Sequence, residues 1–298
     1  MRCYIVLRAL LLELLVQYVS AAAVAATENI RAIYLFKDVL RSDTVSLKTS
    51  GFNTVLIFGV GILDNGDIMY YSNTPGSSDV LVASNGTYVG GDALAEKVRS
   101  FKTGDTSINR VEITTNAHHV RELVANPGTG PETRLFRNFA ALKTAWDLDA
   151  VNNDDEAIYD VASTVALAKL LGQVGYKYTT VPYINSGFWA TITAQINSGL
   201  QEPDLLLDRV YLQCYDGGAS NNPISWQNTL GIKVVPLIWV INDSKPSQGN
   251  TAQQARNRFA NWNSQGPVAG GGYWNDYDIE KMGLSYTEYA DVLTSIFP

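Results

Sequence analysis

The stretch Asp149-Ala150-Val151-Asn152-Asn153-Asp154-Asp155-Glu156 leads from a short strand-like run into a cluster of polar side chains, and a helix-like pattern follows from Asp160. Side chains of an extended strand alternate between two faces, so Asn152, Asp154 and Glu156 are expected to point the same way. Two carboxyl groups crowded on one face cannot both ionise freely, so the pKa of one should rise. A raised pKa keeps a carboxyl group protonated near neutral pH, as a general acid requires. The stretch therefore predicts an acid catalyst, Glu156, with Asp154 as its partner.

The same succession of strand and helix continues on both sides of this stretch. Short runs of β-branched or aromatic residues alternate with longer helical patterns, which indicates parallel strands joined by crossover helices. The expected strands are Ile30–Leu35, Thr54–Phe58, Arg110–Thr115, Leu148–Asp154, Lys177–Pro182, Arg209–Tyr215, Lys233–Val240 and Val268–Trp274. Eight such strands, in a chain longer than the roughly 250 residues that the fold needs, predict an α/β protein of the (β/α)8 TIM-barrel class.

Helices are expected between these strands, and several have recognisable first residues. They are Asp92–Phe101, His118–Ala125, Glu132–Thr144, Asp160–Leu171, Phe188–Ser198, Thr251–Trp262 and Ser285–Ile296. Asp160 and Ser285 fit N-caps, and Pro131 fits a first helical position, where its missing N–H has no partner to lose.

Residues 60–91 interrupt the alternation. Asp64-Asn65-Gly66 and Ser84-Asn85-Gly86 are turn signals between short β-like runs, so a small β-rich insertion is expected after the second strand. In a barrel such an insertion would rise beside the carboxyl ends of the strands, and we expect it to form a wall of the binding cleft.

The first 26 residues resemble a secretory signal peptide. Arg2 and Arg8 supply a charged start, Leu10–Val19 is mostly apolar, and small alanines follow. We expect residues 1–26 to be removed and residues 27–298 to form a single domain of a secreted, extracellular protein.

Two further features agree with export. Asn85 and Asn242 each begin an N-glycosylation pattern, as expected of a glycoprotein. Once the signal is removed, Cys214 is the only cysteine, so no internal disulfide can form. Its apolar neighbours predict a buried, inert thiol.

Charge and composition exclude several classes of partner. The net charge of −7 and the absence of a Lys/Arg cluster disfavour nucleic acids and anionic membranes, whereas neutral polymers such as glycans remain open. No run is long enough to span a membrane. The only histidines, His118 and His119, are adjacent and do not form a metal site unaided, so we expect no metal and no cofactor. We expect a monomer.

Three elements of the sequence resemble glycoside hydrolase family 18, which comprises chitinases and endo-β-N-acetylglucosaminidases. Asp149-x-x-Asn152-x-Asp154-x-Glu156, on the fourth expected strand, is similar to the family signature Asp-x-x-Asp-x-Asp-x-Glu. Gln213-Cys214-Tyr215-Asp216, on the sixth, resembles the Tyr-Asp or Tyr-Asn element. Gly270-Gly271-Gly272-Tyr273-Trp274, on the eighth, resembles the glycine-rich strand that ends in a tryptophan.

The resemblance implies a retaining, substrate-assisted mechanism. Glu156 would protonate the glycosidic oxygen, and Asp154 would hold the substrate's N-acetyl group, whose carbonyl oxygen attacks the anomeric carbon. Tyr215 would donate its hydroxyl to the same acetyl group, and Trp274 would lie beneath the sugar.

The remaining residues of the three elements are expected to bind the substrate as well. Asp216 would bond a sugar hydroxyl or orient the acids, and Gln213 and Asn152 complete the predicted substrate-binding residues. Trp189 and Trp239 are expected at the rim of the cleft, since each lies at or after a strand end.

The sequence departs from the family pattern in two places. Asn152 stands where the family has an aspartate that shares a proton with the equivalent of Asp154, and an amide cannot take up that proton. Thr114-Thr115-Asn116-Ala117 stands near the usual Ser-x-Gly-Gly, so small glycines are replaced.

These departures leave other functions open beside the predicted cleavage of β-linked N-acetylglucosamine glycans. One alternative is a glycan-binding protein on the same barrel that does not cut its ligand. Another is a glycosidase for substrates without an acetamido group. The acidic cluster at Asp154–Glu156 could also be a solvated strand end without catalytic function.

Overall fold

The computed structural model describes residues 29–298. The predicted signal peptide, residues 1–26, lies outside the described residues. Within the described part of the chain, no helix combines the length and the apolar character that crossing a bilayer requires.

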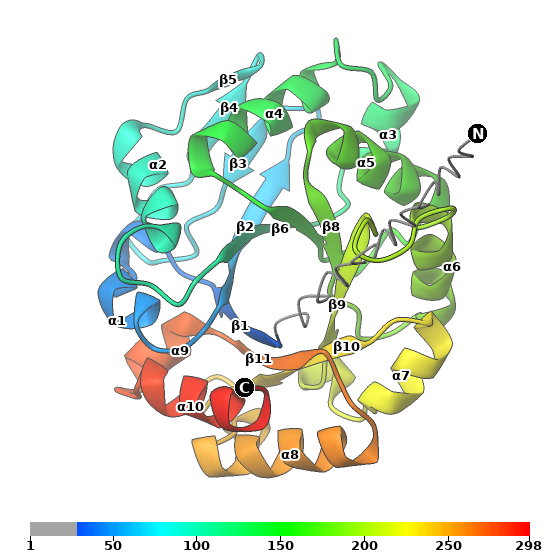
Figure 1. Ribbon diagram of the computed structural model, residues 1–298. Helices are drawn as coiled ribbons and strands as arrows, with labels where there is room; N and C mark the ends of the chain where they lie inside the picture. Colours follow the sequence, from blue (N-terminus) through cyan, green and yellow to red (C-terminus); the bar gives the residue numbers. More distant parts are fainter. Residues whose placement is uncertain (1–28) are drawn as a thin grey trace, which may run out of the picture.

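Eight parallel strands of the described chain form a closed barrel, as the sequence predicts. β1 pairs with both β2 and β11, which closes the ring (Figure 1). The barrel strands are β1 (Ile30–Leu35), β2 (Thr54–Ile62), β6 (Arg110–Thr115), β7 (Ala150–Asn153), β8 (Lys177–Thr180), β9 (Leu207–Gln213), β10 (Val234–Trp239) and β11 (Gly270–Trp274). Because all eight run the same way, their carboxyl ends meet at one end of the barrel, where active sites of this fold lie.

Helices surround the barrel in Figure 1 and cover the outer faces of its strands. They are α1 (Thr44–Lys48), α2 (Asp92–Arg99), α3 (Val120–Ala125), α4 (Arg134–Trp146), α5 (Val161–Val174), α6 (Ser186–Ile196), α7 (Pro223–Leu230), α8 (Ala252–Gln265), α9 (Asp276–Lys281) and α10 (Tyr286–Ile296). The short α1, α7 and α9 were not among the expected helices. The apolar core lies between this layer and the strands, and the thiol of Cys214 is buried in it, as expected.

Helix starts follow the capping side chains. Asp160 and Ser285 are N-caps, as predicted, and accept from the backbone N–H of the third helical residue. The expectation that Pro131 begins a helix is wrong. α4 starts at Arg134 instead, because the Thr133 side chain accepts from the N–H of Phe136 and so caps the helix two residues later.

The predicted β-rich insertion lies outside the ring, after the second strand. β3 (Ile68–Tyr70) pairs antiparallel with the last residues of β2, and β4 (Val80–Ser84) and β5 (Thr87–Tyr88) extend this small sheet. Asn85 and Gly86 form its tight turn, both with positive φ. The insertion packs on α4, at the upper left of Figure 1.

One buried amide fastens the insertion to α4. The Asn138 side chain donates to the carbonyl of Gly66 (2.7 Å) and accepts from the N–H of Gly86 (2.7 Å). Only Tyr71 and Asn73, from the loop after β3, reach the hollow beside the predicted acids. The contribution of the insertion to the cleft wall is therefore limited to that loop.

Candidate active site

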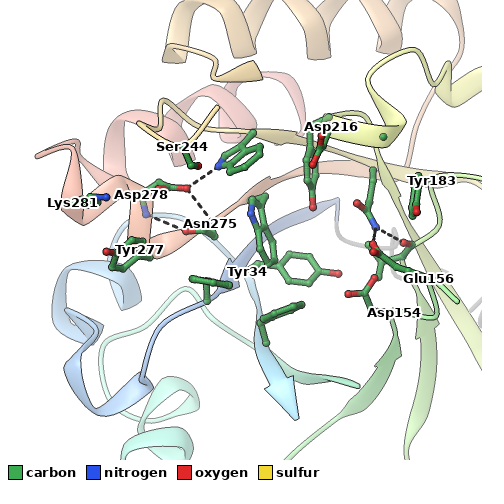
Figure 2. Close-up of a pocket in the computed structure, with 18 of the residues that line it drawn as sticks. Tyr34, Asp154, Glu156, Tyr183, Asp216, Ser244, Asn275, Tyr277, Asp278 and Lys281 are labelled. Carbon is green, nitrogen blue, oxygen red and sulfur yellow. Dashed lines mark hydrogen bonds between the residues drawn. The ribbon is translucent and has the colours of Figure 1, made fainter. Parts of the chain in front are cut away.

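A cleft of about 700 Å³ opens at the carboxyl ends of the barrel strands. Six of the seven predicted site residues line it: Asp154 and Glu156 after β7, Gln213, Tyr215 and Asp216 at and after β9, and Trp274 at the end of β11. Figure 2 shows Asp154 and Glu156 together on one side of this cleft. The barrel thus brings together residues from the fourth, sixth and eighth strands. Asp154 and Trp274, for example, are more than a hundred positions apart in the sequence.

Aromatic rings form the floor of the cleft around Trp274. Its ring centroid lies 4.9 Å from that of Phe58, 5.4 Å from that of Tyr34 and 5.5 Å from that of Phe36. Tyr215 stacks nearly parallel to it, with centroids 6.3 Å apart and an angle of 15° between the planes. These neighbours fix the orientation of the indole and leave an apolar surface of the kind that packs against the C–H face of a sugar.

The raised pKa that the sequence predicts for one acid of the pair falls on Asp154. Its Oδ1 is buried and has no hydrogen-bond partner among the described residues. Burial raises the pKa of Asp154 to about 8, and the negative charges of Glu156 and Asp155 add to the effect. Burial therefore favours the protonated form of Asp154 in the unliganded protein.

Glu156 stands at the mouth of the cleft, where its side chain is exposed to solvent. Its carboxylate accepts from the amide of Gln213 at 3.3 Å, and the same amide donates to the carbonyl of Val181 at 2.9 Å. Gln213 is thereby anchored on β8's carboxyl end and holds Glu156 toward the cleft.

Asp155, which the sequence analysis did not single out, organises the loop that carries Glu156. It is buried, and its carboxylate accepts from the backbone N–H groups of Ala157 (3.0 Å), Ile158 (2.7 Å) and Tyr159 (2.6 Å). An aspartate that caps the backbone just after a strand is a local signal that could have identified it.

The predicted roles of Tyr215 and Asp216 separate in the structure. Tyr215 is buried against Trp274, and burial, followed by the charge of Asp154, raises the pKa of its hydroxyl well above the ordinary value, so it remains a proton donor. Asp216 lies at the exposed rim and forms an ion pair with Lys245. Asp216 is therefore placed to contact a ligand at the rim and not to orient the buried acid.

The prediction that Asn152 contacts the substrate is wrong. Its side chain is fully buried inside the barrel, below the cleft. The amide oxygen accepts from the hydroxyl of Tyr34 at 3.0 Å, and the amide nitrogen donates to the hydroxyl of Thr179 at 2.9 Å. Asn152 and Asp154 lie on the same face, as predicted, but Asn152 is still within β7 whereas Asp154 follows it. The Asn152 side chain therefore points into the barrel interior and does not reach the cleft.

The residues that stand in place of the family's third-strand glycines line a second hollow, which adjoins the main cleft. Thr114, Thr115, Asn116 and Ala117 form part of its wall, and Asp154 and Glu156 separate it from the main cleft. Its volume of about 320 Å³ extends the space available to a ligand on that side of the acids.

Sequence reasoning missed two other groups of cleft residues. Tyr183 lies on the wall near Glu156 (Figure 2), and its ring packs against Gly217, where an added Cβ would lie 2.8 Å from it. Asp278 accepts from the indole N–H of Trp239 (2.7 Å) and from the amide of Asn275 (3.1 Å). The segment Asn275–Asp278 directly follows Trp274, so its polar composition was the available signal.

One further expectation fails because a side chain is buried. Trp239 lines the cleft as expected, but Trp189 is only 2% exposed in the helical layer and is not at the rim. Of the two glycosylation patterns, Asn242 is 2% exposed and its amide donates to the carbonyl of Val240. Asn85, by contrast, is exposed at a hairpin turn.

Among residues 29–298, no group of three or more histidine, cysteine or acidic side chains is arranged to hold a metal ion.

The fold, rather than the sequence, relates this chain to known proteins. No family model matches it, and no curated protein matches it. A glycoside hydrolase family 18 chitinase from Pseudoalteromonas aurantia superposes with a TM-score of 0.63 at 11% identity, over 90% of this chain and 99% of that one. A group IV chitinase from Ostrinia furnacalis, solved with allosamidin, gives 0.61 at 8% identity, over 90% and 98%.

A class V chitinase from Nicotiana tobaccum, solved in complex with NAG4, gives a TM-score of 0.57 at 11% identity, over 91% of this chain and 100% of that one. The chain is thus similar in fold, over nine-tenths of its length, to family 18 chitinases. This likeness agrees with the resemblance carried by the three sequence elements.

Proposed function

We propose that this chain is a glycoside hydrolase that cleaves β-linked N-acetylglucosamine glycans, either chitin-type oligosaccharides or the core of N-glycans. The observation that carries the proposal is the meeting of Asp154, Glu156 and Tyr215 above Trp274 in one open cleft at the carboxyl end of the barrel. The similar fold of the tobacco chitinase that binds NAG4 supports the same class of ligand.

In this proposal, Glu156 is the general acid and base. It is exposed to the cleft and oriented by Gln213, so it can reach the glycosidic oxygen of a sugar that rests on Trp274. The carbonyl oxygen of the substrate's acetamido group attacks the anomeric carbon as that bond breaks, and water later opens the cyclic intermediate with retention of configuration.

Asp154 and Tyr215 act on the acetamido group. Asp154 has a buried oxygen that finds no partner within residues 29–298, and a ligand N–H or carbonyl can satisfy it according to the protonation state of the acid. The Tyr215 hydroxyl, kept protonated by burial, donates to the acetamido carbonyl. Both contacts hold the nucleophile of the reaction in place.

The substitution Glu156→Gln tests the assignment. Hydrolysis of chito-oligosaccharides should fall by about 10²–10⁴-fold, as expected when a general acid is lost, while the melting temperature stays unchanged. Glu132→Gln, at an exposed position away from the cleft, is the matched control and should retain full activity. Unimpaired hydrolysis by Glu156→Gln would rule out the proposed role.

A second candidate function is glycan binding without cleavage. The observation that favours it is the buried amide of Asn152, which cannot share a proton with Asp154 as the family aspartate does. Product analysis after incubation with chito-oligosaccharides and N-glycans separates the two functions. Measurable binding with no product at any pH would favour the binding protein.

Inhibition by an N-acetylglucosamine thiazoline distinguishes substrate-assisted cleavage from a glycosidase whose substrate lacks the acetamido group. The compound mimics the cyclic intermediate, so it should compete with substrate only if the acetamido group is recognised. An active enzyme that the thiazoline does not inhibit would point to the other glycosidase class.

We further propose that the protein is a secreted monomer in which residues 27–298 form one domain. The charged and apolar pattern of residues 1–26 supports export, and the exposed Asn85 is the site we expect to carry a glycan. Mass spectrometry of the protein from a eukaryotic culture medium, with light scattering, tests cleavage near residue 26, glycosylation and the monomeric state together.

A further inference from the structure

A continuous chain of hydrogen bonds crosses the interior of the barrel and ends beneath the cleft. Arg110 Nε donates to Glu112 (2.7 Å), and the Thr179 hydroxyl donates to the other oxygen of Glu112 (2.6 Å). Asn152 Nδ2 donates to Thr179 (2.9 Å), and the Tyr34 hydroxyl donates to Asn152 (3.0 Å). The side chains of Glu112, Thr179, Asn152 and Tyr34 are all buried, so water does not compete for these bonds.

The direction of every bond in this chain is determined at its Glu112 end. A guanidinium can only donate, so Glu112 must accept from Arg110. Arg209 donates to the Tyr211 oxygen at 3.3 Å, which leaves the Tyr211 proton for Glu112, 2.7 Å away. Glu112 therefore accepts throughout, and the single proton of Thr179 is used on it.

The donor-to-acceptor order at Glu112 also determines the order of the hydrogen bonds next to the active site. Because Thr179 has used its proton, it can only accept from residue 152, which must be a donor and is an asparagine. The amide oxygen of Asn152 then faces Tyr34 and accepts the hydrogen bond of the Tyr34 hydroxyl. The single Tyr34 proton is therefore used on Asn152 and is not donated to Asp154, whose Oδ1 meets no donor among the described residues.

We propose that Thr179, held by Glu112, is a positioning residue that keeps the Asn152 amide oxygen facing Tyr34, so that the Tyr34 hydroxyl donates to Asn152 and not to Asp154 in the unliganded protein. Asn152 is then an integrated part of this barrel and not a defect in the family motif. The catalytic meaning of the inference rests on the proposed function, but the proton arrangement does not.

The charged and titratable groups around this chain come from several elements. They are Tyr34 on β1, Arg110 and Glu112 on β6, Asp154, Asp155 and Glu156 after β7, Asp208, Arg209 and Tyr211 on β9, and Tyr215 after β9. Arg110 and Arg209 lie beside Glu112 and Asp208, so the interior charges balance. A neutral substitution at Thr179 therefore changes hydrogen bonding without changing charge.

The test compares Thr179→Val with Thr179→Ser by carboxyl ¹³C NMR titration of Asp154 in the full-length mature protein. Valine removes the acceptor of the Asn152 amide, so the amide can turn its N–H toward Tyr34 and leave the Tyr34 hydroxyl free to donate to Asp154. The titration midpoint of Asp154 should then fall by about one pH unit, because a donor stabilises the ionised form. Serine keeps the hydroxyl and should leave the midpoint unchanged.

Equal midpoints in the two Thr179 variants would overturn the proposal. If Thr179→Val does not fold, Thr179→Ala removes the same hydroxyl with less crowding and carries the same expectation. Glu112→Gln should also lower the midpoint, because its amide can donate to Thr179 and reverse the chain. A lower midpoint in Glu112→Gln alone would reveal a simple charge effect and would likewise overturn the proposal.

Hydrolysis assays keep this inference separate from the proposed function. If the wild-type protein cleaves chito-oligosaccharides, the pH profile of Thr179→Val should move in the same direction as its Asp154 midpoint, whereas that of Thr179→Ser should not. If the wild-type protein cleaves no glycan, the proposed function fails, and the NMR comparison still decides the role of Thr179.

Discussion

Asp154 and Glu156 are two residues apart, yet their surroundings differ sharply. Asp154 turns one oxygen into the barrel, where no donor of the described chain meets it, and Glu156 extends into solvent at the cleft mouth. Sequence reasoning could predict that two neighbouring acids would influence each other. It could not predict which of them is buried, because that depends on Tyr34 and Tyr215, which come from β1 and from beyond β9.

The raised pKa of Asp154 predicts a pH dependence of stability. An unfolded chain loses this proton near pH 4, whereas the folded protein holds it to about pH 8, so the free energy of unfolding should fall as pH rises through that window. Asp154→Asn removes the titration. Between about pH 5 and pH 8, urea unfolding should show wild type losing stability relative to Asp154→Asn, on the order of a few kcal/mol.

Asp105→Asn is the control for this measurement, since Asp105 is an exposed loop acid. Its stability should follow that of the wild type across the same pH range. If the wild type and Asp154→Asn lose stability in parallel, the proton on Asp154 does not contribute as described.

At the scale of elements, strands were more predictable than helices. β1 and β6 match the expected ranges, because β-branched and aromatic runs bounded by polar residues are strong local signals. α1 and α9 were not expected, since five or six residues are too few to show a helical period. The loops after the strands were harder still, because their structure depends on contacts between different loops.

The contact between Tyr183 and Gly217 joins two such loops and predicts a loss of ligand affinity. In Gly217→Ala, the new Cβ would lie 2.8 Å from the Tyr183 ring and would displace it from the cleft wall. Losing an aromatic wall contact should weaken binding of chito-oligosaccharides by about threefold to tenfold, measured by calorimetry on the Glu156→Gln background.

Gly187→Ala is the matched control, because no atom of residues 29–298 lies within 4 Å of a Cβ at that position. It should bind with unchanged affinity. Equal affinities of Gly217→Ala and Gly187→Ala would remove Tyr183 from the proposed binding surface.

At the scale of the whole molecule, closure of the barrel creates the site. β11 carries Trp274 and pairs with β1, which carries Tyr34, although more than two hundred residues separate them in the chain. The glycines of β11 permit this approach. A Cβ at Gly270, where φ is +147°, would lie 2.0 Å from the carbonyl oxygen of Ile30.

Gly270→Ala should therefore prevent normal closure of the ring. We expect a loss of ~3 kcal/mol or more in the free energy of unfolding, or failure to fold, because the clash is with backbone that cannot move aside. Gly104→Ala, in open space at positive φ, isolates the conformational cost of a side chain, about 1 kcal/mol. Similar denaturation midpoints for the two variants would show that the β1–β11 contact tolerates a side chain.

The sequence by itself determined the alternation of strands and helices, the order of the three family-like elements and the identity of the acids, because these depend on local periodicity and on residue type. Only the tertiary structure decided which acid is buried, that Asn152 belongs to an internal hydrogen-bond chain, and that Tyr183 and Asp278 join the cleft. Each of these depends on side chains that meet across the barrel from strands distant in sequence. Local sequence patterns do not reveal such contacts, because the direction of a hydrogen bond depends on every donor and acceptor in the network.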